Sequence, residues 1–336
     1  GPLLHRKGFA EVPVLGGCPI GHRPINFHIE ALERMGVSIE RREHSYYAEA
    51  KEIRGAEIEF PYPSVGATEN VMLAGVLAKG KTVVKNAATE PEIANLIEML
   101  RAMGAKIFLD EEKRIVEIEG VSKLRGVTAS VMPDRNEIVS LAVAGLATGG
   151  DIFIKNINAS YLKTFLEKIE EVGGRVKIHS GGIQFIAGSY KNTYVETSPH
   201  PGFMTDWQQP FCVLLTKSAG ESIIHETVYE DRFAYTGDLN RMGAQIKVSK
   251  DCPQGKNCRY AGQGYKHTAH ITGGTPLKGA DLAVTDLRAG MAHIIAALAA
   301  EGESVISGIG HVDRGYEKID ERLKALGADI RRISTS

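Results

Sequence analysis

A short phrase recurs five times along this chain of 336 residues. In each copy a helix-like run ends in an apolar residue, a glycine follows, and a new apolar stretch begins. The glycines of the five copies are Gly36, Gly104, Gly173, Gly243 and Gly327. The first four lie about 70 residues apart and the last interval is longer, so the chain is an array of similar units.

Each copy predicts the same local structure. Runs such as IANLIEMLRAM place apolar residues at helical spacing, as in a helix that lies on a core. The glycine then supplies the positive φ that ends the helix, and the apolar run after it predicts a strand. A second phrase of helix, glycine and strand lies upstream of four of the copies, at Gly80, Gly149, Gly220 and Gly302. Two phrases that keep one period predict a tandem α/β repeat.

Length and composition narrow the class of protein. A chain of 336 residues is too long for one ordinary core, so two domains are expected, with a linker at Met132-Pro133-Asp134. Forty basic and 41 acidic residues leave no electrostatic footprint for nucleic acid or an acidic membrane. The apolar runs are shorter than the roughly 20 residues that span a bilayer. Four cysteines without a dense framework fit a reducing cytoplasm.

The segment VLGGCPIGHRPINFH, residues 14–28, is the first candidate for chemistry. Two glycines before Cys18 and a proline after it predict a loop. His22 and Arg23 follow closely, and nearby cations favour the reactive thiolate. The alternative is a small buried hydrophobic residue, which is what a lone cysteine most often is.

A second candidate is ETSPHPGFMTDWQQP, residues 196–210. Its prolines and glycine predict an irregular loop that presents Asp206 beside the only tryptophan, Trp207. A carboxylate on a loop suits a general base. Alternatively, Thr205 or Asp206 is the N-cap of the helix that follows.

Two arginines and one helix start are candidates for binding anions. Arg288 and Arg314 carry guanidinium forks that fit carboxylate or phosphate, unless Asp286 and Asp313 hold them in ordinary salt bridges. The turn at residues 64–66 opens a helix whose free N–H groups suit an anion. It lacks the P-loop pattern.

Cysteines and histidines also gather in the stretch that lengthens the last interval of the repeat. Cys252 and Cys258 are six residues apart, and His267 and His270 are three apart. Neither is a standard spacing for structural zinc. The stretch is polar and glycine-rich, so the sequence favours a solvated insertion loop over a metal site.

Six of these segments resemble the enolpyruvyl transferases: GGCPIGHRP, SVGATEN, MPDR, SPHPGFMTD, TDLRAG and HVDRGYEKI. They stand in the family's order and cover nearly the whole chain. The resemblance implies an inside-out α/β barrel of two domains, each of three βαβαββ units with buried helices. It implies a first domain at residues 1–132 with two units, and a second at residues 133–336 with an insertion at about 250–270. Family members carry one more unit upstream, so an N-terminally truncated and divergent member is expected.

The resemblance also implies a reaction. The enolpyruvyl group of phosphoenolpyruvate passes to the 3′-hydroxyl of UDP-N-acetylglucosamine and phosphate is released, in cytoplasmic peptidoglycan synthesis, without metal or organic cofactor. Cys18 matches the general acid, which fosfomycin alkylates, and Asp206 matches the presumptive base. The expected substrate contacts are Arg23, Pro24, Ile25, Asn26, Phe27, Ser64, Val65, Gly66, Val228, Asp286, Arg288 and Arg314.

Some residues depart from the family pattern. NEIVS follows MPDR, and Asn26 replaces a usual acidic residue. Two alternatives therefore stay open. One is transfer to 3-phosphoshikimate, against which the GGC loop and the SPHPGFMTD phrase argue. The other is a homologue that binds a UDP-sugar without turnover, because the unit expected upstream holds further substrate contacts.

Overall fold

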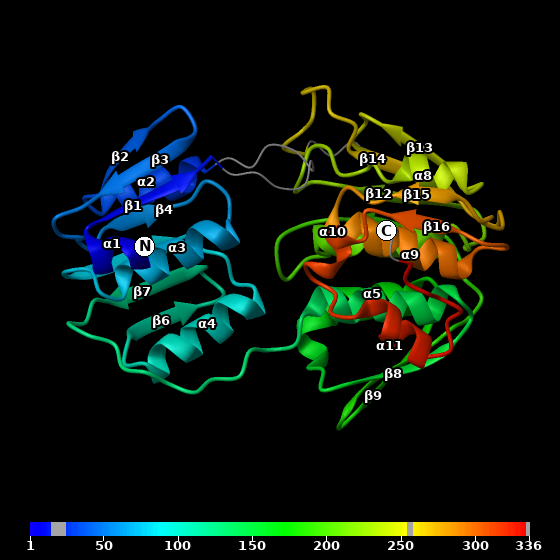
Figure 1. Ribbon diagram of the computed structural model, residues 1–336, viewed down its shortest axis with the longest axis horizontal. Helices are drawn as coiled ribbons and strands as arrows, with labels where there is room; N and C mark the ends of the chain where they lie inside the picture. Colours follow the sequence, from blue (N-terminus) through cyan, green and yellow to red (C-terminus); the bar gives the residue numbers. More distant parts are fainter. Residues whose placement is uncertain (15–24, 254–257, 334–336) are drawn as a thin grey trace. The chain divides into compact units, whose positions relative to one another are not determined.

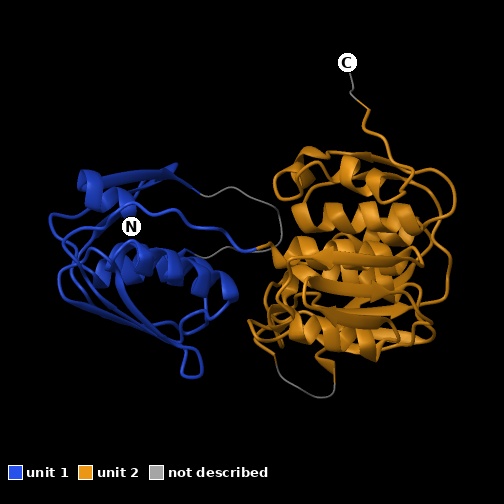
Figure 2. Cartoon of the chain, turned by 90° about the horizontal axis from the view of Figure 1, so that it is seen from below, with its two compact units in different colours: residues 1–17, 23–132 blue, residues 18–22, 133–336 orange. Residues whose placement is uncertain are grey.

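The computed structural model describes residues 1–14, 25–253 and 258–333. Their packing separates two compact units, one ending at Met132 and the other beginning at Pro133 (Figure 2). Each unit has a hydrophobic core of its own. Within the described ranges, none of the helices combines the length and the apolarity that crossing a bilayer requires.

In the part of the first unit that the structure describes, there are two sheets and four helices. The helices are α1 (Pro2–Lys7), α2 (Asn26–Arg34), α3 (Val65–Gly75) and α4 (Pro91–Ala102). One sheet has the order β1-β3-β2, from β1 (Phe9–Pro13), β2 (Ser38–Arg41) and β3 (Ser45–Glu49). The other has the order β4-β5-β7-β6, from β4 (Glu57–Glu59), β5 (Lys81–Lys85), β6 (Lys106–Asp110) and β7 (Ile115–Glu119).

The second sheet of this unit displays the repeat in full. Strands β4 and β5 are parallel, and α3 is the crossover that a parallel pair needs. Helix α4 follows, and β6 and β7 then form an antiparallel pair that β5 extends. The element order is therefore βαβαββ.

The second unit contains three copies of the repeat, of which only the second has the full βαβαββ order in the described residues. The first lacks the opening strand, and the third lacks the closing pair of strands. Its first copy has α5 (Arg135–Ala147), β8 (Asp151–Lys155), η1 (Ala159–Leu162), α6 (Lys163–Glu171), β9 (Arg175–His179) and β10 (Gly182–Ile186). Its second has β11 (Tyr194–Glu196), η2 (Thr205–Trp207), α7 (Gln208–Leu215), β12 (Glu221–His225), α8 (Thr236–Arg241), β13 (Gln245–Ser249) and β14 (Thr268–Thr272). Its third has β15 (Asp281–Ala283), α9 (Leu287–Ala299), β16 (Val305–Ser307), α10 (Gly310–Asp313) and α11 (Ile319–Ala325). The sheet orders are β8-β10-β9, β11-β12-β14-β13 and β15-β16.

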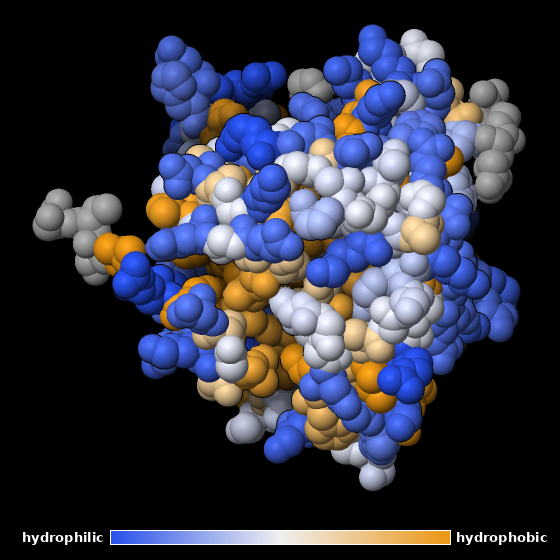
Figure 3. All heavy atoms as spheres, turned by 90° about the vertical axis from the view of Figure 1, so that its right-hand side faces the viewer, coloured by the Kyte–Doolittle hydropathy of each residue, from blue (hydrophilic) through white to orange (hydrophobic). Residues whose placement is uncertain are grey.

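Helices α5, α7 and α9 pack on one another in the interior of the second unit. Every residue of α7 is buried, and so are most residues of α5 and α9. In Figure 1, α5 lies between α9 and the strands β8 and β9. The face shown in Figure 3 is mainly hydrophilic, with hydrophobic side chains gathered in a recess. Helices that are apolar on all sides are buried in this way, because no side of them can face water without cost.

The repeat glycines adopt the backbone conformation predicted for them. All nine have φ between 78° and 104°. The structure adds one more copy of the second phrase, because α1 ends at Gly8 with φ of 77°. The sequence analysis missed this copy since α1 has only six residues.

The strand predicted after Gly327 is wrong. Residues 328–333 form neither a helix nor a strand. The nearest sheet of that repeat contains two parallel strands, β15 and β16, and residues 328–333 pair with neither. A strand needs such pairing because its backbone N–H and C=O groups form their hydrogen bonds with a neighbouring strand and not within the strand itself.

Candidate functional site

The three buried helices of the second unit begin close to one another. Asn136, in the first turn of α5, donates to the Asp206 carboxylate over 3.3 Å. Arg288, in the first turn of α9, reaches the same carboxylate over 3.3 Å. Arg288 also lies 3.7 Å from Asp134, the N-cap of α5. Helix N-termini carry partial positive charge, so this end of the unit is suited to anionic groups.

Asp206 lies at the centre of this arrangement. Its carboxylate accepts from Arg232 Nη2 at 2.6 Å and from Arg288 Nε at 3.3 Å, and 27% of its side chain is exposed. Burial opposes ionisation of this carboxyl, but the two guanidiniums outweigh it and hold the pKa of Asp206 below its usual value. The alternative of an N-cap is wrong: Met204 precedes the short helix η2, and Asp206 makes no cap bond.

Arg232 is a site residue that the sequence analysis missed. Its side chain is only 3% exposed, and its guanidinium lies 5.0 Å from the centre of the Tyr229 ring. It belongs to the phrase EDRFAY that follows β12. A charged triplet after a buried strand was the available signal, but only the fold shows that its arginine meets Asp206.

Glu226 was also missed, and it organises the loop that carries Arg232. The carboxylate is fully buried and accepts from the Thr205 hydroxyl at 2.8 Å. It also accepts from the backbone N–H groups of Val228 and Tyr229, at 2.8 and 3.1 Å. Buried carboxylates need this number of donors, and here the donors fix residues 226–229 beside Asp206.

Arg288 makes side-chain hydrogen bonds across the helix starts, whereas Asp286 caps its own helix. The Arg288 side chain is 12% exposed and donates to Tyr316 Oη at 3.0 Å, which in turn lies 2.8 Å from Ser140 Oγ. Among the described residues, none of the arginine side chains pairs with Asp286. It is the N-cap of α9 and accepts from the N–H groups of Arg288 and Ala289, at 3.1 and 2.8 Å.

Arg314 is exposed and follows α10. The expected alternative, a salt bridge with Asp313, is wrong, because Asp313 pairs with Arg332 at 2.8 Å. Among the residues that the structure describes, no ion pair to Arg314 is present. Its guanidinium is therefore available to a ligand.

In the first unit the structure brings together two of the predicted stretches. Ile25 precedes α2, and the ring of Phe27 lies 6.0 Å from that of Phe60. Ser64 is the N-cap of α3, and its hydroxyl accepts from the Ala67 N–H at 3.3 Å. A Cβ atom at Gly66 would lie 3.4 Å from the His28 ring on α2.

Val65 and Asn26 complete the described part of this region. Val65 is the first residue of α3, and Asn26 is the first of α2, where its side chain donates to Glu30 at 3.4 Å. Cys18, Arg23 and Pro24 lie outside the described residues.

The insertion differs from the solvated loop that the sequence favours. Cys252 and Cys258 are partly buried and His267 is buried, and the three meet His225 from the end of β12. His270 points elsewhere and lies 3.6 Å from Glu221. The expected solvation of these three side chains is wrong, because linear spacing could not reveal that they pack against the end of β12.

Val228 connects the insertion to the loop after β12. Its carbonyl accepts from the Tyr260 hydroxyl at 2.6 Å, and its N–H donates to Glu226. Tyr260 is 4% exposed. The insertion therefore holds the segment in which a nucleotide contact is expected.

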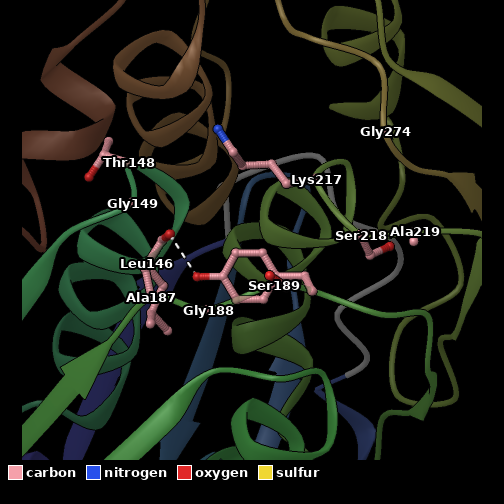
Figure 4. A pocket seen from close by; sticks show the side chains of 11 residues that line it. Leu146, Thr148, Gly149, Ala187, Gly188, Ser189, Lys217, Ser218, Ala219 and Gly274 are labelled. Atoms are coloured by element: carbon pink, nitrogen blue, oxygen red, sulfur yellow. Dashed lines mark hydrogen bonds between the residues drawn. The ribbon is translucent and has the colours of Figure 1, made fainter.

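A pocket of about 430 Å³ lies at the other end of the buried helices (Figure 4). It is lined by residues that follow α5 and α7, among them Gly149, Lys217 and Ser218. Tyr190 and Leu146 also line the pocket, and the Tyr190 hydroxyl donates to the Leu146 carbonyl at 2.8 Å. Asp206 precedes α7 whereas Lys217 follows it, so this pocket is separate from the acidic and basic groups above.

The predicted inside-out α/β architecture is confirmed by solved structures. The enolpyruvyl transferase NikO from Streptomyces tendae superposes with a TM-score of 0.83 at 23% identity, over 98% of this chain and 75% of that one. EPSP synthase from Acinetobacter baumannii gives a TM-score of 0.68 at 19% identity, over 96% of this chain and 75% of that one.

Relatives in sequence agree with the fold. A UDP-N-acetylglucosamine 1-carboxyvinyltransferase from Protochlamydia amoebophila is 48% identical over 326 residues, 95% of this chain and 70% of the relative. Proteins of the same name from Chlamydia trachomatis serovar D and Caulobacter vibrioides are each 43% identical, over 98% and 99% of this chain and 75% and 74% of their own lengths.

The family model described as EPSP synthase (3-phosphoshikimate 1-carboxyvinyltransferase) matches residues 1–323. This match and the identity to the bacterial relatives show that the chain belongs to the EPSP synthase family of enolpyruvyl transferases.

Proposed function

We propose that this chain transfers the enolpyruvyl group of phosphoenolpyruvate to the 3′-hydroxyl of UDP-N-acetylglucosamine and releases phosphate. The observation that carries the proposal is the 48% identity, over 95% of the chain, to a protein named for that reaction. Asp206 and its partners Arg232 and Arg288, here called the Asp206 cluster, support the proposal. Both substrates are polyanions, and the cluster supplies arginine side chains to hold them.

The reaction is an addition followed by an elimination. The sugar hydroxyl adds to carbon 2 of phosphoenolpyruvate while its proton goes to a base and the methylene carbon takes a proton from an acid. In the elimination, the new methyl group returns a proton to the acid that was deprotonated in the addition, phosphate departs, and the double bond is restored. We assign the acid to Cys18 and the base to Asp206, since such a step needs one group on each side of the reacting carbon.

Asp206 is held in its proton-accepting form by its surroundings. With its pKa below the usual value it is ionised at neutral pH, but Arg232 and Arg288 also weaken it as a base. A substrate carboxylate or phosphate that takes over guanidinium hydrogen bonds from Asp206 would raise its basicity. Substrate binding thereby activates the base in this proposal.

We further propose that the two compact units correspond to the two family domains, with boundaries at 1–132 and 133–336. In the first, residues 23–27 and Ser64 to Gly66 contact the sugar nucleotide. In the second, Val228 does so, while Arg288 and Arg314 contact phosphoenolpyruvate together with Arg23.

A phosphate-release assay with both substrates tests the function. We expect turnover by the chain, a loss of about 10²–10⁴-fold in kcat for Asp206→Asn, and a comparable loss for Cys18→Ala. Asp313→Asn is the matched control for a carboxylate paired with an arginine at the surface, and it should keep the rate. Turnover of 3-phosphoshikimate in place of the sugar nucleotide would refute the substrate assignment.

Fosfomycin labelling tests the thiol separately. We expect one adduct at Cys18 and none at Cys212, which lies in the core of α7 and whose pKa burial raises to about 12. Binding of the sugar nucleotide in a calorimeter without phosphate release would favour the non-catalytic alternative.

A further inference from the structure

Four side chains with metal-binding atoms converge in the second unit, outside the Asp206 cluster. His225 ends β12, His267 directly precedes β14, and Cys252 and Cys258 lie in the connection between β13 and β14. One ligand atom from each lies within 4.8 Å of every other. The two sulfurs are 3.5 Å apart, and Cys252 Sγ is 3.4 Å from His267 Nε2.

Hydrogen bonds on the far side of each imidazole orient it toward the cluster. The Thr268 hydroxyl donates its proton to the Asp251 carbonyl at 2.6 Å, so its oxygen accepts from His225 Nδ1 at 2.9 Å. His267 Nδ1 lies 2.9 Å from the Tyr265 carbonyl, which can only accept. Both rings therefore carry their proton on Nδ1 and present the lone pair of Nε2, as metal-bound histidines do.

We propose that His225, Cys252, Cys258 and His267 bind one zinc ion as a tetrahedral structural site. Zinc–sulfur bonds of about 2.3 Å and zinc–nitrogen bonds of about 2.0–2.1 Å give tetrahedron edges of roughly 3.3–3.8 Å. The two measured separations lie in that range, and a small rotation of the side chains closes the longest one. The set of two thiolates and two neutral imidazoles is a soft ligand set that zinc prefers and that calcium and magnesium avoid.

Other chemistry for the same residues fits less well. In a two-iron cluster with mixed ligands the cysteines hold one iron and the histidines the other, which separates them. Here a cysteine sulfur and a histidine nitrogen lie 3.4 Å apart. A disulfide requires the sulfurs to approach to about 2.05 Å, and it does not explain why the two histidine rings are oriented toward the sulfurs.

The zinc site would hold the insertion against the loop after β12. The His267 carbonyl accepts from the Glu226 N–H at 2.8 Å, and Tyr260 binds the Val228 carbonyl. In each bond one partner, Glu226 or Val228, belongs to the segment that leads to Arg232, and the other belongs to the insertion. The metal thus fixes the proposed nucleotide contact at Val228, a consequence that rests on the proposed function, whereas metal binding itself does not.

Elemental analysis of the full chain, purified under reducing conditions and desalted, tests the site. We expect one zinc per chain for the wild type and for the matched control His270→Gln. The variants His267→Gln and Cys252→Ser/Cys258→Ser should lose the zinc. Cobalt added to the metal-free wild type should give the intense visible bands of tetrahedral coordination with a sulfur charge-transfer band, which keeps the test valid where a variant fails to fold.

Several results would overturn the proposal. They are a wild type that binds neither zinc nor tetrahedral cobalt, iron in place of zinc, or a peptide mass two hydrogens lighter from a Cys252–Cys258 disulfide. Removal of zinc should lower the Tm and raise KM for the sugar nucleotide more than KM for phosphoenolpyruvate. A chain that binds zinc yet lacks turnover would retain the site and refute the function, and unchanged Tm on removal would refute the structural role.

Discussion

The helices α3, α5 and α9 occupy the same place in the repeat, but the residues at their N-termini differ between the two units. In the first unit α3 begins behind Ser64, whose uncharged hydroxyl caps it. In the second unit α5 and α9 begin behind Asp134 and Asp286, and Arg288 reaches across from α9 to Asp134 and Asp206. The second unit therefore carries its own network of charges at this end, whereas the start of α3 leaves its positive end for a ligand to neutralise.

The largest effect should come from breaking the charge network. Arg232→Met leaves the Asp206 carboxylate with one of its two arginines, and loss of a buried ion-pair partner costs about 3–5 kcal/mol of unfolding free energy. Urea unfolding followed by the fluorescence of Trp207, the only tryptophan and a core residue of the second unit, measures it.

The control for this prediction is Arg241→Met. Arg241 pairs with Asp238 at 2.9 Å, but 59% of its side chain is exposed, so the change should stay within about 1 kcal/mol. Equal losses for the two variants would mean that the network at the second unit's helix starts is no stronger than a surface pair.

A smaller effect should appear in the dependence of stability on pH. The folded pKa of Asp206 is depressed, so its stabilisation is present above the unfolded pKa of about 3.9 and is lost as pH falls through the folded value. In Asp206→Asn the unfolding free energy should therefore fall less between pH 5 and the acid limit than in the wild type.

Trp207 fluorescence in urea at a series of acidic pH values provides the measurement. The exposed Asp281, changed to Asn, is the matched control and should leave the acid limb of the curve as in the wild type. An Asp206→Asn curve parallel to the wild type would contradict the depressed pKa.

The smallest effect is expected at the uncharged helix start. Ser64→Ala removes the cap of α3 and should cost about 1 kcal/mol, seen as faster hydrogen exchange of the first amides of α3. Ser64→Asp keeps a cap but adds a negative charge, so it should preserve the protection and weaken binding of the sugar nucleotide. Tighter binding of the sugar nucleotide by Ser64→Asp would contradict the view that the start of α3 is left positive for an anionic ligand.

Much of the fold could be predicted because its signals are local. The glycines that end the helices, the alternation of the following strands and the period of the array all appear in the sequence. The positive φ values confirm the glycines, and the strands after Gly36, Gly104, Gly173 and Gly243 confirm the alternation. The prediction failed after Gly327, where an apolar run finds no strand to pair with. Strand formation depends on a distant partner, which the run itself does not encode.

The candidate site was only partly predictable. Asp206 and Arg288 stood out through their motifs, but Arg232 lies in a charged phrase that is typical of a surface, and Glu226 directly follows β12 outside any motif. The grouping of cysteines and histidines was not predictable for a related reason. His225 belongs to β12, far from the insertion in sequence, and it lies with Cys252, Cys258 and His267, whereas His270 does not.

The repeated helix–glycine–strand units follow from local sequence, because a glycine, a cap or an alternation acts on the residues beside it. Which charges meet depends on the way the chain packs. Asp206 takes hydrogen bonds from residues 26, 70 and 82 positions away. Two of the donors, Asn136 and Arg288, reach it because α5, α7 and α9 pack together, and the third, Arg232, comes from the loop after β12. Such contacts depend on how buried helices fit against one another in space, and that is settled when the core packs.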